Sequence, residues 1–441
     1  MRGFPRRCRL RAALAGALLV AAGCGDWLAP PRDVPFPEIR PEPAYEALFP
    51  TYVELCALSQ IRPLDGPFGG SAGHAVMYLK GACKDEAAPY PRLRRCRRAA
   101  STTDDPEHGA GVSVNQVFRN VNWVAVPGKA LFYQGLLPPE ERFTRERFAA
   151  TVQAAIEDDV YAGVVLRDDP DTGAPPALAD FVTSDGLGTD FALRLTRTLF
   201  CARLPVTTEM LDEIIDFLND LNRQYATGAA DYRWSGIHDN CVHTLRNALA
   251  AASIWEPKSI NLIKLRQLFQ LAIPANEVAT LAEMGSNGPL DDFDAIYGED
   301  AWRTALLEFG WLPTRHGALL SILPVHQSND LYDTTFRQLI LEGPLGRRTT
   351  QRVRELFLDE RNLDLEDNLI HFRNDYQRIL AGRSEARPEA ELRGGRRRTV
   401  RRRYERYIEA QLAEVRHQLE ELTRRNDART SRAGTPSAGS P

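Results

Sequence analysis

The sequence predicts an α+β fold, and two patterns along the chain support this prediction. Short apolar or alternating segments typical of strands lie between residues 74 and 133, and longer segments with helical periodicity follow from residue 144. Strands followed by helices favour an antiparallel sheet. With 441 residues, of which 43% are hydrophobic, the chain can bury the core of one large domain or two.

Four segments have strand character. Residues 74–79 are apolar and follow a glycine-rich entry, residues 112–117 and 121–126 alternate, and residues 130–133 form a further short run. The pattern before them, from residue 45 to residue 55, is mixed and predicts no single element.

Helices are expected over residues 144–158, 207–225, 240–252 and 260–271. The second begins at Thr207-Thr208-Glu209, a helix-start pattern. Its apolar residues then recur on one side of the helix: Met210, Leu211, Ile214, Ile215, Leu218 and Leu221.

The N-terminus predicts export. Five arginines precede the apolar run of residues 12–22, and Gly23-Cys24 follows at once. The run is shorter than the ~20 residues that span a bilayer and has the proportions of a signal peptide. Small residues before Cys24 resemble the bacterial lipobox, although Ala21 stands where Leu is usual. We expect residues 1–23 to be removed and Cys24 to carry lipid, the alternative being an ordinary secretory signal with a chance cysteine.

This origin predicts a protein of the bacterial cell envelope, lipid-anchored and facing the periplasm, with the outer membrane favoured over the inner. Residues 24–45 are rich in proline and predict a stiff linker. Removing residues 1–23 takes away five arginines and no acidic residue, which moves the formal charge from −4 to −9. Net acidity argues against a nucleic-acid partner.

The cysteines divide into pairs and one remainder. Cleavage removes Cys8 and lipidation uses Cys24, which leaves an odd number in an oxidising compartment. Cys83 and Cys96 flank a polar loop that contains proline and are the easiest pair to join. Cys56 and Cys201 are the second expected pair by elimination, and Cys241 remains as a thiol.

The C-terminal part of the chain has no chemical motif. We divide the sequence into a thiol domain over residues 46–285, a mostly helical region over 286–385, and a basic amphipathic helix with a tail over 386–441. His316 and His326 are interpreted as structural. The helix either packs on the domain or contacts anionic lipid head groups. Its apolar positions are Val400, Tyr404, Ile408, Leu412, Val415, Leu419 and Leu422.

Cys241 is the candidate nucleophile. Asp239 or Asn240 caps the expected helix, so Cys241 lies at a helix N-terminus, where the dipole favours a thiolate and backbone N–H groups can stabilise an oxyanion. A thiol nucleophile needs a base, and His74 opens the first expected strand. The alternatives are a buried structural cysteine with a core histidine, and a zinc site of His238, Cys241 and His243 that lacks an evident fourth ligand.

The order Gly73-His74, then His238-Asp239-Asn240-Cys241, resembles the circularly permuted papain-like fold, and most closely the periplasmic N-terminal domain of one class of bacterial lipoprotein N-acyltransferases. Residues 111–114 and 122–124 also match, so the resemblance covers about residues 50–285. It implies a papain-like core in which Cys241 is the nucleophile, His74 the general base, and a polar residue on the neighbouring strand orients the imidazole. We expect Asn115 in that role, with Asn122 as the alternative.

The resemblance implies thiol-dependent transfer or hydrolysis of acyl groups, possible without a cofactor. Because lipid anchoring brings the site near acyl-chain donors, lipid-derived acyl groups are the favoured substrate, and cell-wall peptide cleavage is the second enzymatic hypothesis. The non-enzymatic hypothesis is a lipoprotein that uses the fold as a binding module or scaffold.

Overall fold

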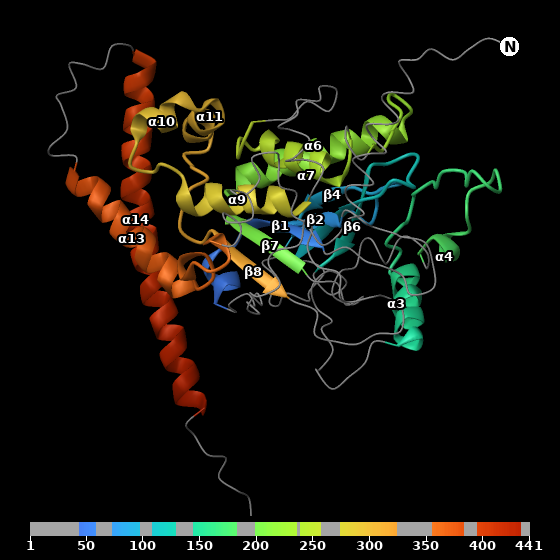
Figure 1. Cartoon of the computed structure of the whole chain (residues 1–441), viewed down its shortest axis with the longest axis horizontal. Helices are drawn as coiled ribbons and strands as arrows, with labels where there is room; N and C mark the ends of the chain where they lie inside the picture. The colour runs from blue at the N-terminus through green and yellow to red at the C-terminus, as the bar shows by residue number, and fades with distance from the viewer. Residues whose placement is uncertain are drawn as a thin grey trace, which may run out of the picture.

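The computed structural model describes residues 44–58, 73–97, 108–128, 144–182, 199–235, 239–256, 274–323, 355–382 and 395–433. Within them lies an antiparallel sheet with the strand order β6-β5-β2-β1-β7-β8 (Figure 1). Its strands are β1 (Tyr52–Leu58), β2 (His74–Lys80), β5 (Gly109–Val114), β6 (Trp123–Pro127), β7 (Leu199–Pro205) and β8 (Leu319–Leu323). Strands β3 (Ala82–Lys84) and β4 (Leu93–Arg95) form a separate ribbon. The predicted α+β class is therefore confirmed.

Helices cover one face of this sheet. They are α6 (Thr208–Ala226), α7 (Cys241–Ala251) and α9 (Pro274–Asn287), which lie side by side in Figure 1. The indole Nε1–H of Trp123 donates to the Leu218 carbonyl of α6 at 2.8 Å, which identifies the helix-covered face as that of Trp123 and its cross-strand partner Val114. Residues on this face are almost all apolar.

The opposite face is also buried, and it carries charged and hydrogen-bonding side chains among its apolar ones. The register aligns Glu54 with Arg203 and Tyr78, and it aligns Cys56 with Cys201 and Val76. Alternation along the strands then places the side chains of His74 and Ser113 on this same face. Arg203 donates to both carboxylate oxygens of Glu54 at 3.1 Å, so the two buried charges compensate each other.

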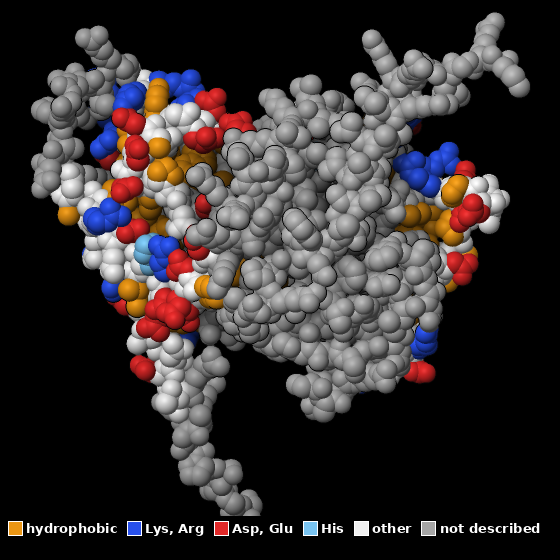
Figure 2. Space-filling model, viewed as in Figure 1, with side chains coloured by type: hydrophobic (Ala, Val, Ile, Leu, Met, Phe, Trp, Pro, Cys, Tyr) orange, Lys and Arg blue, Asp and Glu red, His pale blue; other side chains and the backbone are white. Residues whose placement is uncertain are grey.

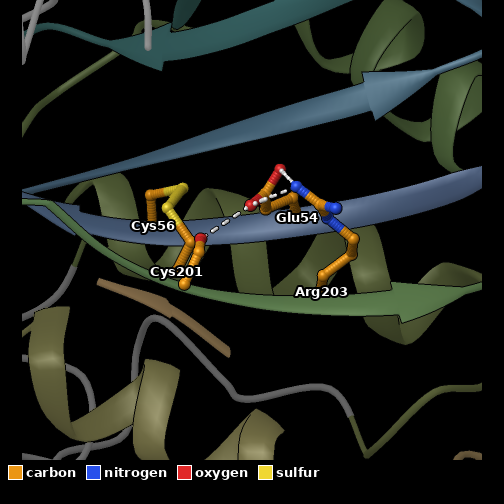
Figure 3. The surroundings of a disulfide bond; sticks show 5 residues. Glu54, Cys56, Cys201 and Arg203 are labelled. Carbon is orange, nitrogen blue, oxygen red and sulfur yellow. Dashed lines mark hydrogen bonds and ion pairs between the residues drawn. A yellow bond between two sulfur atoms is a disulfide. The ribbon is translucent and has the colours of Figure 1, made fainter. Parts of the chain in front are cut away.

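Both expected disulfides are confirmed. Cys83–Cys96 closes the β3–β4 ribbon, and Cys56–Cys201 joins the neighbouring strands β1 and β7 across 145 residues of sequence. In Figure 3 the second disulfide lies beside the Glu54–Arg203 pair on one side of the sheet. Glu54, Cys56 and Cys201 have the mutual spacing of metal ligands, but the disulfide removes both thiolates from that role.

The helices outside the sheet are α2 (Tyr45–Leu48), α3 (Arg145–Glu157), α4 (Leu178–Phe181), α10 (Phe293–Gly298), α11 (Asp300–Glu308), α13 (Leu365–Gly382) and α14 (Gly395–Ala433), with the 3-10 turn η3 (Glu360–Asn362). Helix α14 packs on α10, α11 and α13, and its apolar residues Val400, Ile408 and Val415 are fully buried. The C-terminal helix therefore packs on the domain. None of the described helices is both long and apolar enough to cross a bilayer.

Helices α3, α6 and α7 begin and end within a residue or two of the predicted bounds, and β2, β5 and β6 lie at predicted strands. Strands β1 and β7 were not predicted, and β8 comes from the region expected to be mostly helical. Before α7, an isolated bridge joins Ser235 to Asp239. Several expectations lie outside the described residues: the signal and linker with Cys24, the segments 130–133 and 260–271, His238, His326, residues 386–394 and the tail.

Candidate functional site

Cys241 is the first residue of α7, and Asn240 caps that helix. The Asn240 side-chain oxygen accepts the backbone N–H groups of Val242 and His243, at 2.8 and 3.1 Å. The ring nitrogen Nδ1 of His243 accepts the backbone N–H of Asn240 in return. Asn240 is therefore the N-cap, and it is one of the two residues expected in that role. The cap therefore engages two of the N–H groups at the helix start, where donors to an oxyanion were expected.

The Cys241 thiol is buried, with 8% of the residue exposed, and it belongs to neither disulfide. Ser235 and Asp239 exchange two backbone hydrogen bonds of 2.7 and 3.0 Å, which brings the segment that contains Tyr232 back alongside the start of α7. Burial raises the pKa of the Asp239 carboxyl to about 6. Burial also raises the pKa of the Tyr232 phenol well above its usual value, and the charges of Asp239 and Cys241 add to this effect.

His74 begins β2 and follows Gly73, whose φ of 78° lies in the left-handed region that favours glycine. Its Nε2 lies 2.9 Å from the Ser113 hydroxyl oxygen, and both residues are buried. Ser113 pairs with Val76 on β2, so it reaches His74 diagonally on the same face. The predicted orienting residue was Asn115. Its side-chain oxygen instead accepts the backbone N–H of Val117 at 3.0 Å, within its own turn.

The start of α7 and the start of β2 lie at the same end of the sheet. Thr244, one turn beyond Cys241, donates its hydroxyl to Asn122 Oδ1 at 2.9 Å. Asn122 directly precedes β6, whose first residue Trp123 pairs with Val114, the last residue of β5. Helix α7 also packs on β2 and β5. Asn122, the alternative orienting residue, thus anchors the helix that carries the thiol.

The two groups approach this end from different sides. Alternation places the His74 side chain on the face opposite to α7. Since His74 is the first residue of its strand, an imidazole there reaches the thiol only around the rim of the sheet. This requirement is the geometric condition that any Cys241–His74 chemistry must meet.

No protein family, curated protein or solved structure matches this chain. The functional argument therefore depends on the chemistry of the described residues.

Two buried donors near the start of α7 complete the site. The hydroxyl of Tyr232 and the side-chain nitrogen of Asn122 are buried and have no hydrogen-bond partner among the residues that the structure describes. A buried donor without a partner loses about 1–3 kcal/mol relative to water. Such groups recur where a ligand or a transition state supplies the acceptor.

Proposed function

We propose that the protein is a thiol-dependent acyltransferase or hydrolase in which Cys241 forms an acyl-thioester. The observation that supports this most directly is the position of Cys241. It is a buried thiol at the first residue of a capped helix, in a chain whose other described cysteines form disulfides. A helix N-terminus stabilises a thiolate, which is the nucleophilic form of cysteine.

His74 serves as the base in this proposal. Because Ser113 holds Nε2, the other ring nitrogen, Nδ1, is the atom that exchanges a proton with the thiol. The Cys241 sulfur bonds to the substrate carbonyl carbon as its proton passes to the imidazole. The carbonyl carbon then releases its leaving group, which takes that proton. An amine or water later attacks the thioester and restores the thiol.

The oxyanion of this step needs donors, and the capped helix start no longer supplies the N–H groups of Val242 and His243. The partnerless hydroxyl of Tyr232 and amide nitrogen of Asn122 are the side-chain donors that we assign to it. A single well-placed donor of this kind contributes on the order of 10²–10³ in rate.

The substrate class follows from the expected location. If Cys24 carries lipid, the protein is held near a membrane, and lipid-derived acyl groups are the nearest donors. Cell-wall peptide cleavage uses the same thiol, so the two hypotheses differ in the group that becomes attached to Cys241. Intact-mass analysis of protein incubated with phospholipid or with cell-wall peptide distinguishes a fatty-acyl from a peptidyl adduct.

The test of the proposal is the reactivity of the thiol in the folded chain. An ordinary cysteine titrates near ~8.5, so we expect iodoacetamide to label Cys241 below about pH 8 and Cys241→Ala to abolish this labelling. His74→Ala should raise the pH that labelling needs. The matched control is His108→Ala, which removes another buried histidine at the opposite end of β2, where His108 contacts Glu46.

Two outcomes would contradict the enzyme. One is an unreactive Cys241 in a chain that is folded by circular dichroism. The other is a labelling profile that His74→Ala leaves unchanged. Either result would favour a non-catalytic scaffold, a role with which the 8% exposure of Cys241 is also compatible.

A further inference from the structure

The first turns of α14 have the wrong charge for a helix start. A helix N-terminus carries a partial positive charge and favours acidic side chains. The first turn of α14 contains no acidic residue and instead begins with Arg396, Arg397 and Arg398. Each of these charges is unfavourable beside the positive end of the helix dipole. This part of the helix is therefore poised to bind an anion, but the dipole alone does not define a site.

The decisive observation is which arginines lack a counter-charge. Seven arginines lie between residues 396 and 406. Arg397 pairs with Asp294, and Arg401 pairs with Glu405. The other five are exposed and form no ion pair with any residue that the structure describes, and four of them, Arg396, Arg398, Arg402 and Arg403, lie within eight residues at the start of the helix. We call these four residues the arginine cluster.

Spacing makes the cluster repulsive by itself. Arg398 and Arg402 are one turn apart, and Arg406 follows Arg402 by another turn, so like charges lie next to one another on the exposed side. Figure 2 shows Lys and Arg side chains gathered at the end of the molecule where α14 begins, with acidic side chains among them. An external anion would relieve both the repulsion and the unfavourable dipole.

The orientation of the helix is fixed by its other side. Val400 and Tyr404 are buried, and the guanidinium carbons of Arg397 and Arg401 lie 5.6 and 4.8 Å from the Phe293 ring centroid. Helix α14 therefore cannot turn its apolar side outward without breaking the core it shares with α10 and α13. Any contact made by the cluster is at the surface, through charge, and does not insert the helix.

We infer that the arginine cluster docks on the anionic phosphate head groups of a membrane surface. Guanidinium groups bind phosphate oxygens in a bidentate manner, and four of them within eight residues span only about 12 Å along the helix. The formal charge of the whole chain is −4, so a polyanion that wrapped around the molecule would be repelled by most of its surface. A flat anionic surface can instead contact the arginine cluster alone. The docking does not depend on the thiol chemistry of Cys241.

The experiment compares two double variants of the full chain. Arg402→Gln/Arg403→Gln removes half of the cluster, and Arg416→Gln/Arg424→Gln removes two exposed arginines from the second half of the same helix. Both are made in a Cys24→Ser background, so that an attached lipid cannot mask the difference. Binding is measured by co-sedimentation with vesicles of phosphatidylcholine, with and without phosphatidylglycerol.

We expect binding to require phosphatidylglycerol and to weaken as salt is added. Each arginine near an anionic surface contributes on the order of a fivefold change in affinity, so the cluster variant should bind about 25-fold more weakly and the control within about twofold of the parent. Hydrogen exchange over residues 395–406 should slow when anionic vesicles are added.

Several results would overturn the inference: equal binding to vesicles without phosphatidylglycerol, equal losses in the two double variants, or unchanged exchange at the start of α14. Labelling of Cys241 should be the same in both variants. This readout separates a failure of docking from a failure of the proposed thiol function.

Discussion

Ser113 Oγ lies 2.9 Å from Nε2 of His74, and the two side chains belong to neighbouring strands on the same buried face of the sheet. A hydroxyl can fix the orientation of an imidazole, but it cannot stabilise an imidazolium as a carboxylate does. If His74 is the base of Cys241, Ser113 acts as a positioning residue with a modest effect.

The first prediction concerns this pair. Ser113→Ala removes one neutral hydrogen bond, worth about 0.5–1.5 kcal/mol, and should slow iodoacetamide labelling of Cys241 about three- to tenfold at a pH below 8. Ser113→Thr keeps the hydroxyl and should restore the rate. Asn115→Ala is the matched control, because the bond that the Asn115 side chain makes to a described residue lies within its own turn. A larger effect at Asn115 than at Ser113 would restore the original expectation for the third residue.

The second prediction concerns Asp239, whose pKa burial raises to about 6. The folded state prefers the protonated carboxyl. The contribution of Asp239 to stability is therefore fully present below its unfolded pKa near ~3.9 and is lost as the pH rises through about 6. The loss is at most about 3 kcal/mol and smaller in proportion to the partial exposure of Asp239. Asp239→Asn should remove this decline in urea unfolding measured from pH 4 to pH 8.

The same substitution tests the thiol. Above pH 6 the ionised Asp239 places a negative charge two residues from Cys241 and disfavours a thiolate. Asp239→Asn should therefore shift the labelling profile of Cys241 to lower pH. An unchanged profile would show that the two groups do not interact in the folded protein.

The third prediction concerns the disulfides. In the chain-entropy treatment a loop of about 15 residues is stabilised by about 3 kcal/mol and one of about 100 residues by nearly 5. Cys56 and Cys201 are 145 residues apart in the sequence, and Cys83 and Cys96 are 13 residues apart. Replacing the first pair by alanine should therefore reduce the free energy of unfolding by more than replacing the second pair. Chemical unfolding of the two double variants measures the difference. A greater loss from the short loop would contradict the entropic argument.

The fourth prediction concerns the N-terminus. Mature protein should begin at Cys24, carry a lipid mass and partition into detergent, because the arginine-rich start, the apolar run and Gly23-Cys24 together match a lipoprotein signal. Cys24→Ser should leave precursor or release a soluble form. Wild-type protein recovered without lipid from the periplasm would refute this prediction.

Elements with local signals were predicted well. Thr207 and Asn240 cap α6 and α7, and both helix starts were predicted from the sequence. Strands β1 and β7 were missed because Glu54 and Arg203 interrupt their apolar patterns, and a sequence does not reveal that these two charges compensate each other across the sheet. Strand β8 is short and pairs with β7 from more than 100 residues away, a contact without a local signal.

Some of the local structure around His74 and Cys241 was expected. Asn115 was expected to orient His74, but the register places Ser113 of the same strand opposite Val76 and within 2.9 Å of the imidazole. Whether Ser113 or Asn115 lies beside His74 depends on the register between β2 and β5. The alternation of side chains cannot decide this, because two registers that differ by two residues place the same side chains on the same face. The N-cap of α7 was expected. The sequence did not show that the cap side chain would accept the N–H groups of both Val242 and His243.

The position of β8 at the end of the sheet has a consequence for biosynthesis. Until residue 323 is available, the outer edge of β7 has no neighbour on that side, although the other strands of the sheet have all been made. An unpaired strand edge is a template for association with other chains. Pairing so distant in sequence is also slow. Chains interrupted before residue 319 should therefore aggregate through β7, and the nascent protein should depend on chaperones until its last strand has joined.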